Sequence, residues 1–163
     1  MARLLGAVAG MAAALTRASI VIAAALMLLA ITYQVVMRYG FGATPSWSEE
    51  LAVLLFSWSV LGGLALGVRE GWHVRLTLLP DALPPWARIW TERATDAVTA
   101  ALGLFLAWSG WRFLDLTSGS VSAAAGYPIE ILNALAPISG ALMALFALER
   151  VLRPGGALES PAA

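Results

Sequence analysis

The stretch ASIVIAAALMLLAITYQVVM (residues 18–37) contains no charged residue and lies between Arg17 and Arg38. An α-helix rises about 1.5 Å per residue and the hydrocarbon core of a bilayer is about 30 Å thick, so about 20 apolar residues cross it. The stretch has 20 residues and is bounded on each side by an arginine. It therefore predicts a helix that spans a membrane.

Three further stretches without charge follow along the chain, over residues 51–68, 97–111 and 131–148. The second of these three reaches the length of a span if its helix continues by about a turn at each end. In the whole chain 60% of the residues are hydrophobic and 12% are charged, whereas soluble domains contain about 25% charged residues. The sequence thus predicts an all-α membrane protein with four transmembrane helices, over residues 18–37, 51–68, 94–114 and 131–148.

The arginines predict how these spans are oriented. All ten basic residues are Arg, and only Arg38 and Arg112 border the first and third connections between spans. The other eight precede the first span, lie between the second and third, or follow the fourth. Because basic residues are enriched in cytoplasmic segments, we expect both termini and the middle connection in the cytoplasm.

The two ends of the chain are expected to lie outside a membrane domain of residues 18–153. Residues 1–17 place large apolar residues on one helical face, namely Leu4, Val8, Met11 and Leu15. This pattern predicts an amphipathic helix on the cytoplasmic surface of the membrane. A cleavable signal peptide is the alternative, because an early Arg precedes a run of small and apolar residues. Residues 154–163 are expected to form a flexible tail.

The stretch TPSWSEELA (residues 44–52) precedes the second span on the side opposite to the cytoplasm. Ser46 and Glu49 match the S-x-x-E pattern of a capping box. Glu49 and Glu50 would lie in the first helical turn, where the helix dipole stabilises negative charge, and Trp47 suits the membrane interface. A second acid beside an exposed Trp would also form a surface for another protein, so both interpretations stay open.

Small residues recur every four positions in two spans. The second span carries Ser59, Gly63 and Gly67, and the fourth carries Ala136, Gly140 and Ala144. Such stripes let transmembrane helices approach closely, but the spacing does not tell whether the partner helix belongs to this chain. Two prolines mark helix geometry as well. Pro85 suits the first turn of the third helix, and Pro137 should kink the fourth.

The composition excludes several classes of function. The formal net charge is zero, and no motif resembles a nucleic-acid reader. There is no cysteine and a single histidine, His73, which leaves no thiolate nucleophile, no Cys-based metal site and no bis-histidine haem. Glu49 and Glu50 are about 100° apart around a helix, which is poor geometry for joint acid–base catalysis. We therefore expect no enzyme, no cofactor and no metal site.

Transport by this chain alone is also disfavoured. The four uncharged stretches contain no Asp, Glu, Arg, Lys or His, whereas ion-coupled transport requires ionisable or polar groups within the membrane and often uses broken helices. A stand-alone four-helix efflux transporter would need an intramembrane carboxylate. That transporter and a structural membrane anchor subunit remain as alternative functions.

The segment MRYGFGATPSWSEELAVLLFSWSVLGGLALGVREGWHVRLTLLP (residues 37–80) resembles the small membrane subunit, the DctQ type, of tripartite ATP-independent periplasmic (TRAP) transporters. The family shows R-Y-x-F-x-x-x-x-x-W-x-E-E-L, here residues 38–51, and V-R-E-G-x-H-V-R, here residues 68–75. Looser similarities extend the match over residues 18–153, at Pro84, Pro85, Gly126, Pro128, Glu149 and Arg150. Thr77 stands where the family often has an acid, which puts any role of that carboxylate in doubt here.

The resemblance implies a scaffold subunit of the bacterial inner membrane that contacts lipid and a large membrane subunit. That large subunit would hold the substrate and sodium sites, and a periplasmic substrate-binding protein would deliver an organic acid. The resemblance implies partner-interface or structural roles for the motif residues Arg38, Trp47, Glu49, Glu50, Arg69, Glu70 and His73. Helix packing is expected from Ser59, Gly63, Gly67 and Gly140.

Overall fold

The structure, a computed structural model, describes residues 2–71 and 84–152. Its helices in chain order are α1 (Ala2–Phe41), α2 (Trp47–Glu70), α4 (Pro85–Leu116), α5 (Glu130–Asn133) and α6 (Leu135–Leu152). Four segments are long and apolar enough to cross a membrane: Leu4–Phe41, Trp47–Glu70, Arg93–Leu116 and Glu130–Leu152. Each contains one of the predicted spans, so the all-α fold with four membrane-spanning helices is confirmed.

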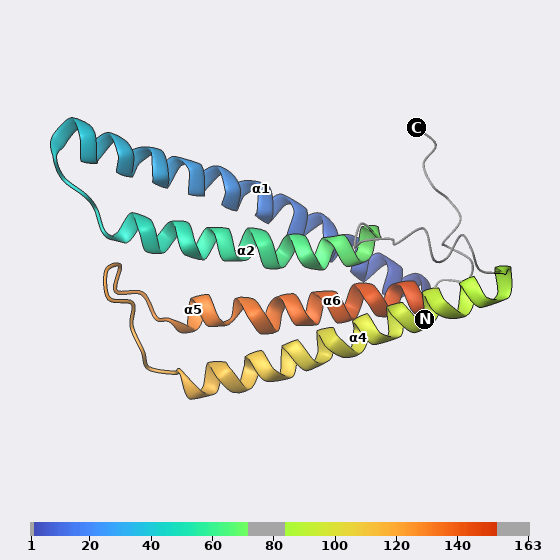
Figure 1. Cartoon of the computed structure of the whole chain (residues 1–163). Helices are drawn as coiled ribbons and strands as arrows, with labels where there is room; N and C mark the ends of the chain where they lie inside the picture. The colour runs from blue at the N-terminus through green and yellow to red at the C-terminus, as the bar shows by residue number, and fades with distance from the viewer. Residues whose placement is uncertain (1, 72–83, 153–163) are drawn as a thin grey trace, which may run out of the picture.

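The helices form two pairs. α1 packs along α2, α4 packs along α6, and α2 and α6 lie side by side between them (Figure 1). Residues 42–46 and 117–129 connect helices at one end of the bundle, which we call the loop end. At the opposite end lie the beginning of α1 and the last turns of α2 and α6 (Figure 1). We call it the ion-pair end, for contacts described below.

α1 is one continuous helix of 40 residues. The helix continues through residue 17, where the sequence predicts the start of the membrane domain. Beside this point the Thr16 hydroxyl donates to the Ala12 carbonyl and the Ser19 hydroxyl to the Thr16 carbonyl. The Ala-rich sequence favours helix, and α1 contains no proline that would end it. The position of the first turns relative to a membrane surface stays a prediction.

The prolines lie where the helices begin or break. Pro85 is the first residue of α4, and Pro84 before it has the extended backbone of an N-cap. The fourth span is interrupted at Ala134, so that α5 ends at Asn133 and α6 begins at Leu135. Pro137 lacks the N–H that would bond to the Asn133 carbonyl four residues earlier. This accounts for an interruption one turn before Pro137.

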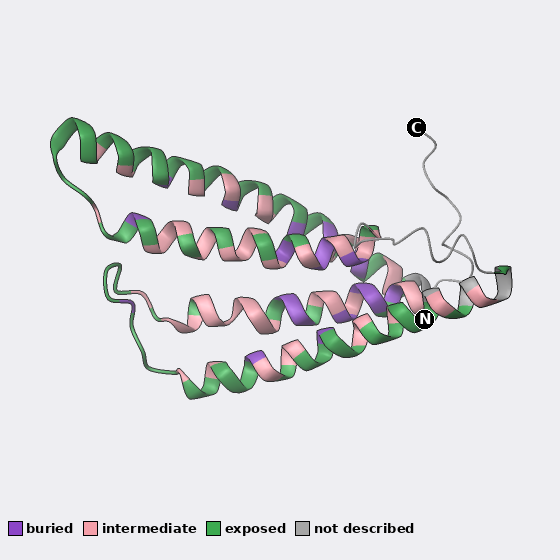
Figure 2. Ribbon diagram, in the orientation of Figure 1, coloured by how far each residue is buried: buried purple, intermediate pink, exposed green. Residues whose placement is uncertain are grey.

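The buried core gathers near the ion-pair end. Its members come from α1, α2 and α6, and are Ala9, Ala13, Ala65, Leu66, Val68, Phe146 and Ala147. Figure 2 shows the outer faces of α1 and α4 largely exposed, with the buried positions turned inward. Exposed large apolar side chains are expected in a chain whose solvent is lipid, since little hydrophobic force drives helices together there.

α4 and α6 approach closely through glycines. A Cβ atom on Gly140 would lie 2.5 Å from the Ala107 nitrogen, and one on Gly103 would lie 2.7 Å from the Ala144 nitrogen. Neither position has room for a side chain. Gly63 of α2 is different, because a Cβ there would meet nothing within 4 Å. Of the two predicted small-residue stripes, the one in α6 therefore packs within this chain, and Gly63 faces open space.

Candidate functional site

The ion-pair end is held by a nearly buried salt bridge between α2 and α6. Arg69 Nε lies 3.1 Å from Glu149 Oε2, and the Glu149 side chain is only 3% exposed. The Arg69 guanidinium also lies 5.9 Å from the centroid of the Phe146 ring, a cation–π contact. Arg69, the last-turn residue of α2 predicted to have an interface or structural role, is thus joined to α6 on two sides.

Arg150 connects three helices at the same end. Its Nε lies 3.0 Å from Asp96 Oδ1 on α4, and its Nη1 donates to the Val68 carbonyl of α2 at 2.9 Å. That carbonyl belongs to the last turn of α2, where a cation is favoured by the helix dipole. Arg150 therefore fixes the spacing of α2, α4 and α6.

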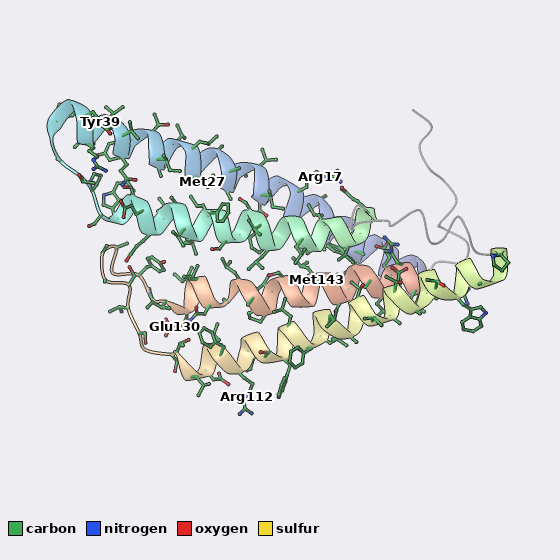
Figure 3. The ribbon with its side chains drawn as sticks, viewed as in Figure 1. Arg17, Met27, Tyr39, Arg112, Glu130 and Met143 are labelled. Carbon is green, nitrogen blue, oxygen red and sulfur yellow. The ribbon has the colours of Figure 1, made fainter. Side chains whose placement is uncertain are left out.

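A third ion pair joins α1 to α2. Arg17 reaches from α1 to the C-terminal end of α2 (Figure 3), where its guanidinium pairs with the Glu70 carboxylate. The side chains of Arg17 and Glu70 are 64% and 34% exposed. An exposed pair of this kind contributes little to stability.

Glu50 at the loop end binds the connection between α4 and α5. Its carboxylate accepts hydrogen bonds from the Ser122 hydroxyl and from the backbone N–H groups of Ala124, at 3.1 Å, and Ala125, at 2.9 Å. The Ser122 hydroxyl also accepts from the Ala125 N–H at 3.2 Å. The second acid of the W-x-E-E motif therefore clamps a loop of its own chain.

The clamped loop has internal structure. The Ser122 N–H donates to the Tyr127 carbonyl at 2.8 Å, next to an isolated bridge between Val121 and Pro128. The Gly119 N–H donates to Glu130 Oε1 at 2.5 Å, which ties the start of the loop to α5. Figure 3 shows Glu130 where the loop enters α5, while Arg112 on α4 points away from the bundle.

Glu49 has a different partner from Glu50. Its Oε1 accepts from Gln34 Nε2 of α1 at 2.8 Å. Trp47 lies against Tyr33 of α1, with ring centroids 5.8 Å apart. The W-x-E-E motif thus contacts α1 through Trp47 and Glu49, and the loop through Glu50.

The predicted capping box at Ser46 is wrong. Ser46 is the N-cap residue of α2, but its side chain makes no capping hydrogen bond. Its φ and ψ of −66° and −26° are already helical, whereas a capping side chain needs an extended backbone. The Ser48 hydroxyl instead donates to the Pro45 carbonyl at 2.6 Å. Glu49 and Glu50 do lie in the first turn of α2, as expected.

The remaining predicted residues are scattered. Arg38 is exposed in the last turn of α1. The Ser59 hydroxyl donates to the Leu55 carbonyl within α2, and the Gly67 carbonyl accepts from the N–H of Gly71, the left-handed C-cap. His73 lies outside the described residues. Within residues 2–71 and 84–152, no group of three or more His, Cys, Asp or Glu side chains could hold a metal ion.

The predicted site residues did not include Ser122, Glu130, Asp96 or Gln34. Their partners lie 72 residues away for Ser122 and 15 for Gln34, so no local pattern could have paired them. The one available signal was position, because Asp96 and Glu130 are acids at the edges of uncharged stretches.

Comparison with known proteins identifies the family. Residues 27–154 match the family described as tripartite ATP-independent periplasmic transporters, DctQ component. A Haemophilus influenzae protein named as a TRAP transporter small permease protein is 27% identical over 128 residues, covering 78% of this chain and 80% of the relative.

Two Vibrio cholerae proteins are also similar. The sialic acid TRAP transporter small permease protein SiaQ is 28% identical over 128 residues, covering 78% of this chain and 73% of SiaQ. The C4-dicarboxylate TRAP transporter small permease protein DctQ is 29% identical over 79 residues, which cover 48% of this chain and 34% of that protein. With its four apolar spans, this chain belongs to the DctQ family, as a multi-pass inner-membrane subunit of TRAP transporters and not an enzyme.

Proposed function

We propose that this chain is the non-conducting subunit of a sodium-coupled TRAP transporter. In this proposal it pairs with a large membrane subunit, which carries the substrate and the ions across the membrane. A periplasmic substrate-binding protein delivers the substrate. The small subunit supplies a rigid surface that supports the large one.

The main support for this proposal is how the Ser and Thr hydroxyls inside the spans form their hydrogen bonds. The hydroxyls of Ser59, Thr95 and Thr99 donate to backbone carbonyls four residues earlier in their own helices. The buried Ser139 hydroxyl does the same with the Leu135 carbonyl. A transport path needs polar groups that are free to coordinate a solute. The hydroxyl protons of these side chains are instead bound to carbonyls of their own helices, which suits a scaffold.

The distribution of charge supports an orientation. Arg17, Arg69 and Arg150 lie at the ion-pair end, whereas Arg38 and Arg112 are the arginines that border the connections at the loop end. By the preference of basic residues for the cytoplasm, we place the ion-pair end and both termini in the cytoplasm. The clamped loop then faces the periplasm, where a binding protein would approach.

The substrate class is proposed from the relatives. SiaQ is named for sialic acid and the Vibrio cholerae DctQ protein for C4-dicarboxylates. Both are organic acids, so we propose that the complex containing this chain also imports an organic acid.

The surface of α2 supports pairing with a second membrane protein. Gly63 has no atom within 4 Å of the position of a Cβ, and it lines a shallow groove of about 480 Å³ together with Ile20, Val60, Leu64, Gly67 and neighbouring residues. Glycines exposed along a membrane helix allow another helix to approach its backbone. We propose that a helix of the large subunit packs here.

Reconstitution in sealed vesicles tests the proposal. Vesicles would contain this chain, its large subunit, or both, and receive the binding protein loaded with radiolabelled organic acid under an inward sodium gradient. We expect uptake with both membrane subunits and background uptake with this chain alone. Uptake by this chain alone would contradict the non-conducting role. Full uptake by the large subunit alone would contradict the need for a scaffold.

A further inference from the structure

The first four turns of α1 have two different faces. The inner face carries small residues, of which Ala9 is 0% and Ala13 is 2% exposed. Both belong to the core cluster with Phe146 and Ala147 of α6. This face packs against the ion-pair end of the bundle.

The inner face also lies against the salt bridge itself. A Cβ atom on Gly6 would lie 3.7 Å from Glu149 Oε1, and one on Gly10 would lie 3.6 Å from Arg69 Nη2. Glycine at both positions brings the α1 backbone close to the two charged groups. The start of α1 is therefore part of the cover that leaves Glu149 only 3% exposed.

The outer face of the same turns is apolar and exposed. Leu4, Val8, Met11 and Leu15 are 73%, 51%, 64% and 66% exposed. They follow the spacing of one helical face, and no charged residue lies between Arg3 and Arg17. An exposed apolar surface of this extent needs a partner that is itself apolar.

This outer face continues into the membrane-spanning part of α1. Farther along the helix, Ile22, Leu26 and Leu29 extend the same stripe, and they too are exposed. The apolar segment Leu4–Phe41 has 38 residues, so at about 1.5 Å per residue it is about 57 Å long, against a hydrocarbon core of about 30 Å. Tilt of about 20° does not absorb this difference. Several turns must therefore lie outside the hydrocarbon core.

We propose that the outer face of residues 4–15 binds membrane lipid at the edge of the acyl-chain region, while the inner face of the same turns covers the Arg69–Glu149 ion pair. Lipid fits better than a protein partner because the apolar surface is continuous with the membrane-spanning surface of α1. Exposed apolar residues such as Val21, Leu28 and Val35 continue this surface along the membrane-spanning part of α1.

This arrangement has a physical consequence for the ion pair. Leaving a buried carboxylate without its partner is costly, and the inner face of α1 lies against both charged groups. This role concerns the chain and the bilayer only, so it does not depend on the proposed transporter function.

Because the sequence contains no cysteine, a single introduced cysteine can be labelled specifically. A single Met11→Cys variant of the full chain is labelled with a nitroxide and placed in vesicles of phosphatidylethanolamine and phosphatidylglycerol, with and without the large subunit. Electron paramagnetic resonance then measures collision with oxygen, which concentrates in acyl chains, and with a water-soluble nickel chelate. Leu26→Cys serves as the lipid control and Ala123→Cys, on the exposed loop, as the water control.

We expect the ratio of oxygen to nickel accessibility at residue 11 to be several-fold higher than at residue 123 and to approach that at residue 26, with or without the large subunit. A ratio equal to that at residue 123 would mean that water covers the face. Protection from both reagents would mean that protein covers it. Either result would overturn the proposal. A Leu15→Cys variant, on the same face, repeats the measurement if labelling at residue 11 disturbs folding.

Discussion

The two ends of the bundle are closed by different kinds of contact. At the ion-pair end, Arg69 meets Glu149 and Arg150 meets Asp96, so charged groups on one helix bind charged groups on another. At the loop end, Glu50 binds a hydroxyl and two backbone N–H groups of a loop. The first arrangement joins helices to one another, and the second holds a loop against a helix end.

This difference indicates what each end can tolerate. A nearly buried charge that loses its partner is costly, so losing one charge at the ion-pair end should destabilise the packing of the helices there. A carboxylate that binds loop amides in an exposed region can be lost while the helices keep their contacts. We therefore expect charge removal at the ion-pair end to lower the free energy of unfolding. Charge removal at the loop end should release the loop.

The largest expected effect is that of Glu149→Gln. It leaves Arg69 without its opposite charge in a site that is nearly closed, and we expect a loss of about 3 kcal/mol in the free energy of unfolding, near the lower limit for broken buried pairs because Arg69 keeps some solvent contact. Unfolding in mixed micelles titrated with SDS measures it.

Glu70→Gln is the matched control, since it removes a charge from the exposed pair with Arg17. It should cost about 0–1 kcal/mol. If both variants lose the same amount, burial does not distinguish the two pairs, and the ion-pair end does not depend on its buried charges in particular.

The next effect is that of Gly140→Ala, between the two ends. A Cβ there would lie 2.5 Å from the Ala107 nitrogen, so α4 and α6 must separate, and we expect a loss of about 1–3 kcal/mol. Gly63→Ala introduces the same methyl group into open space. The control should be neutral or slightly stabilising, because Ala favours helix over Gly. The same unfolding titration applies, and an equal loss in both variants would show that the α4–α6 contact is not specially close.

The smallest effect on stability is expected for Glu50→Gln. The neutral amide loses the charge-assisted bonds to the loop, and because Glu50 lies outside the buried core, the free energy of unfolding should change little. The local effect should be clear, because the amides of Ala124 and Ala125 lose their acceptor. Hydrogen exchange of residues 117–129, followed by mass spectrometry, measures it.

Glu49→Gln is the control for that experiment. Glu49 accepts from Gln34 on α1 rather than from the loop, so its replacement should leave exchange of the loop unchanged. If hydrogen exchange of the loop were accelerated equally in the two variants, the clamp would not be specific to Glu50. Both acids would then hold the loop.

The sequence was sufficient for features that depend on neighbouring residues. Uncharged stretches located the four spans, Pro85 the start of α4, and the acids at residues 49–50 the first turn of α2. The same kind of reasoning went wrong at Ser46, where the chain is already helical one residue before the helix. A capping pattern shows which groups could form a capping hydrogen bond. It does not show which backbone angles the turn imposes.

Features that depend on distant residues could not be predicted. Arg69 and Glu149 are 80 residues apart, and Glu50 binds a loop more than 70 residues away. Gly63 and Gly140 both lie in stripes of small residues, yet Gly140 contacts α4 and Gly63 faces open space. Spacing identifies a surface suited to close approach, and the tertiary fold decides which of these surfaces is used within the chain.

Affinity purification of this chain from its native membranes in mild detergent, followed by mass spectrometry, tests the central claim most directly. As a non-conducting subunit of a TRAP transporter, the chain should be recovered with one large polytopic membrane protein in a fixed ratio. Recovery of this chain only, alone or with further copies of itself, would contradict the scaffold role and favour a small self-assembling transporter.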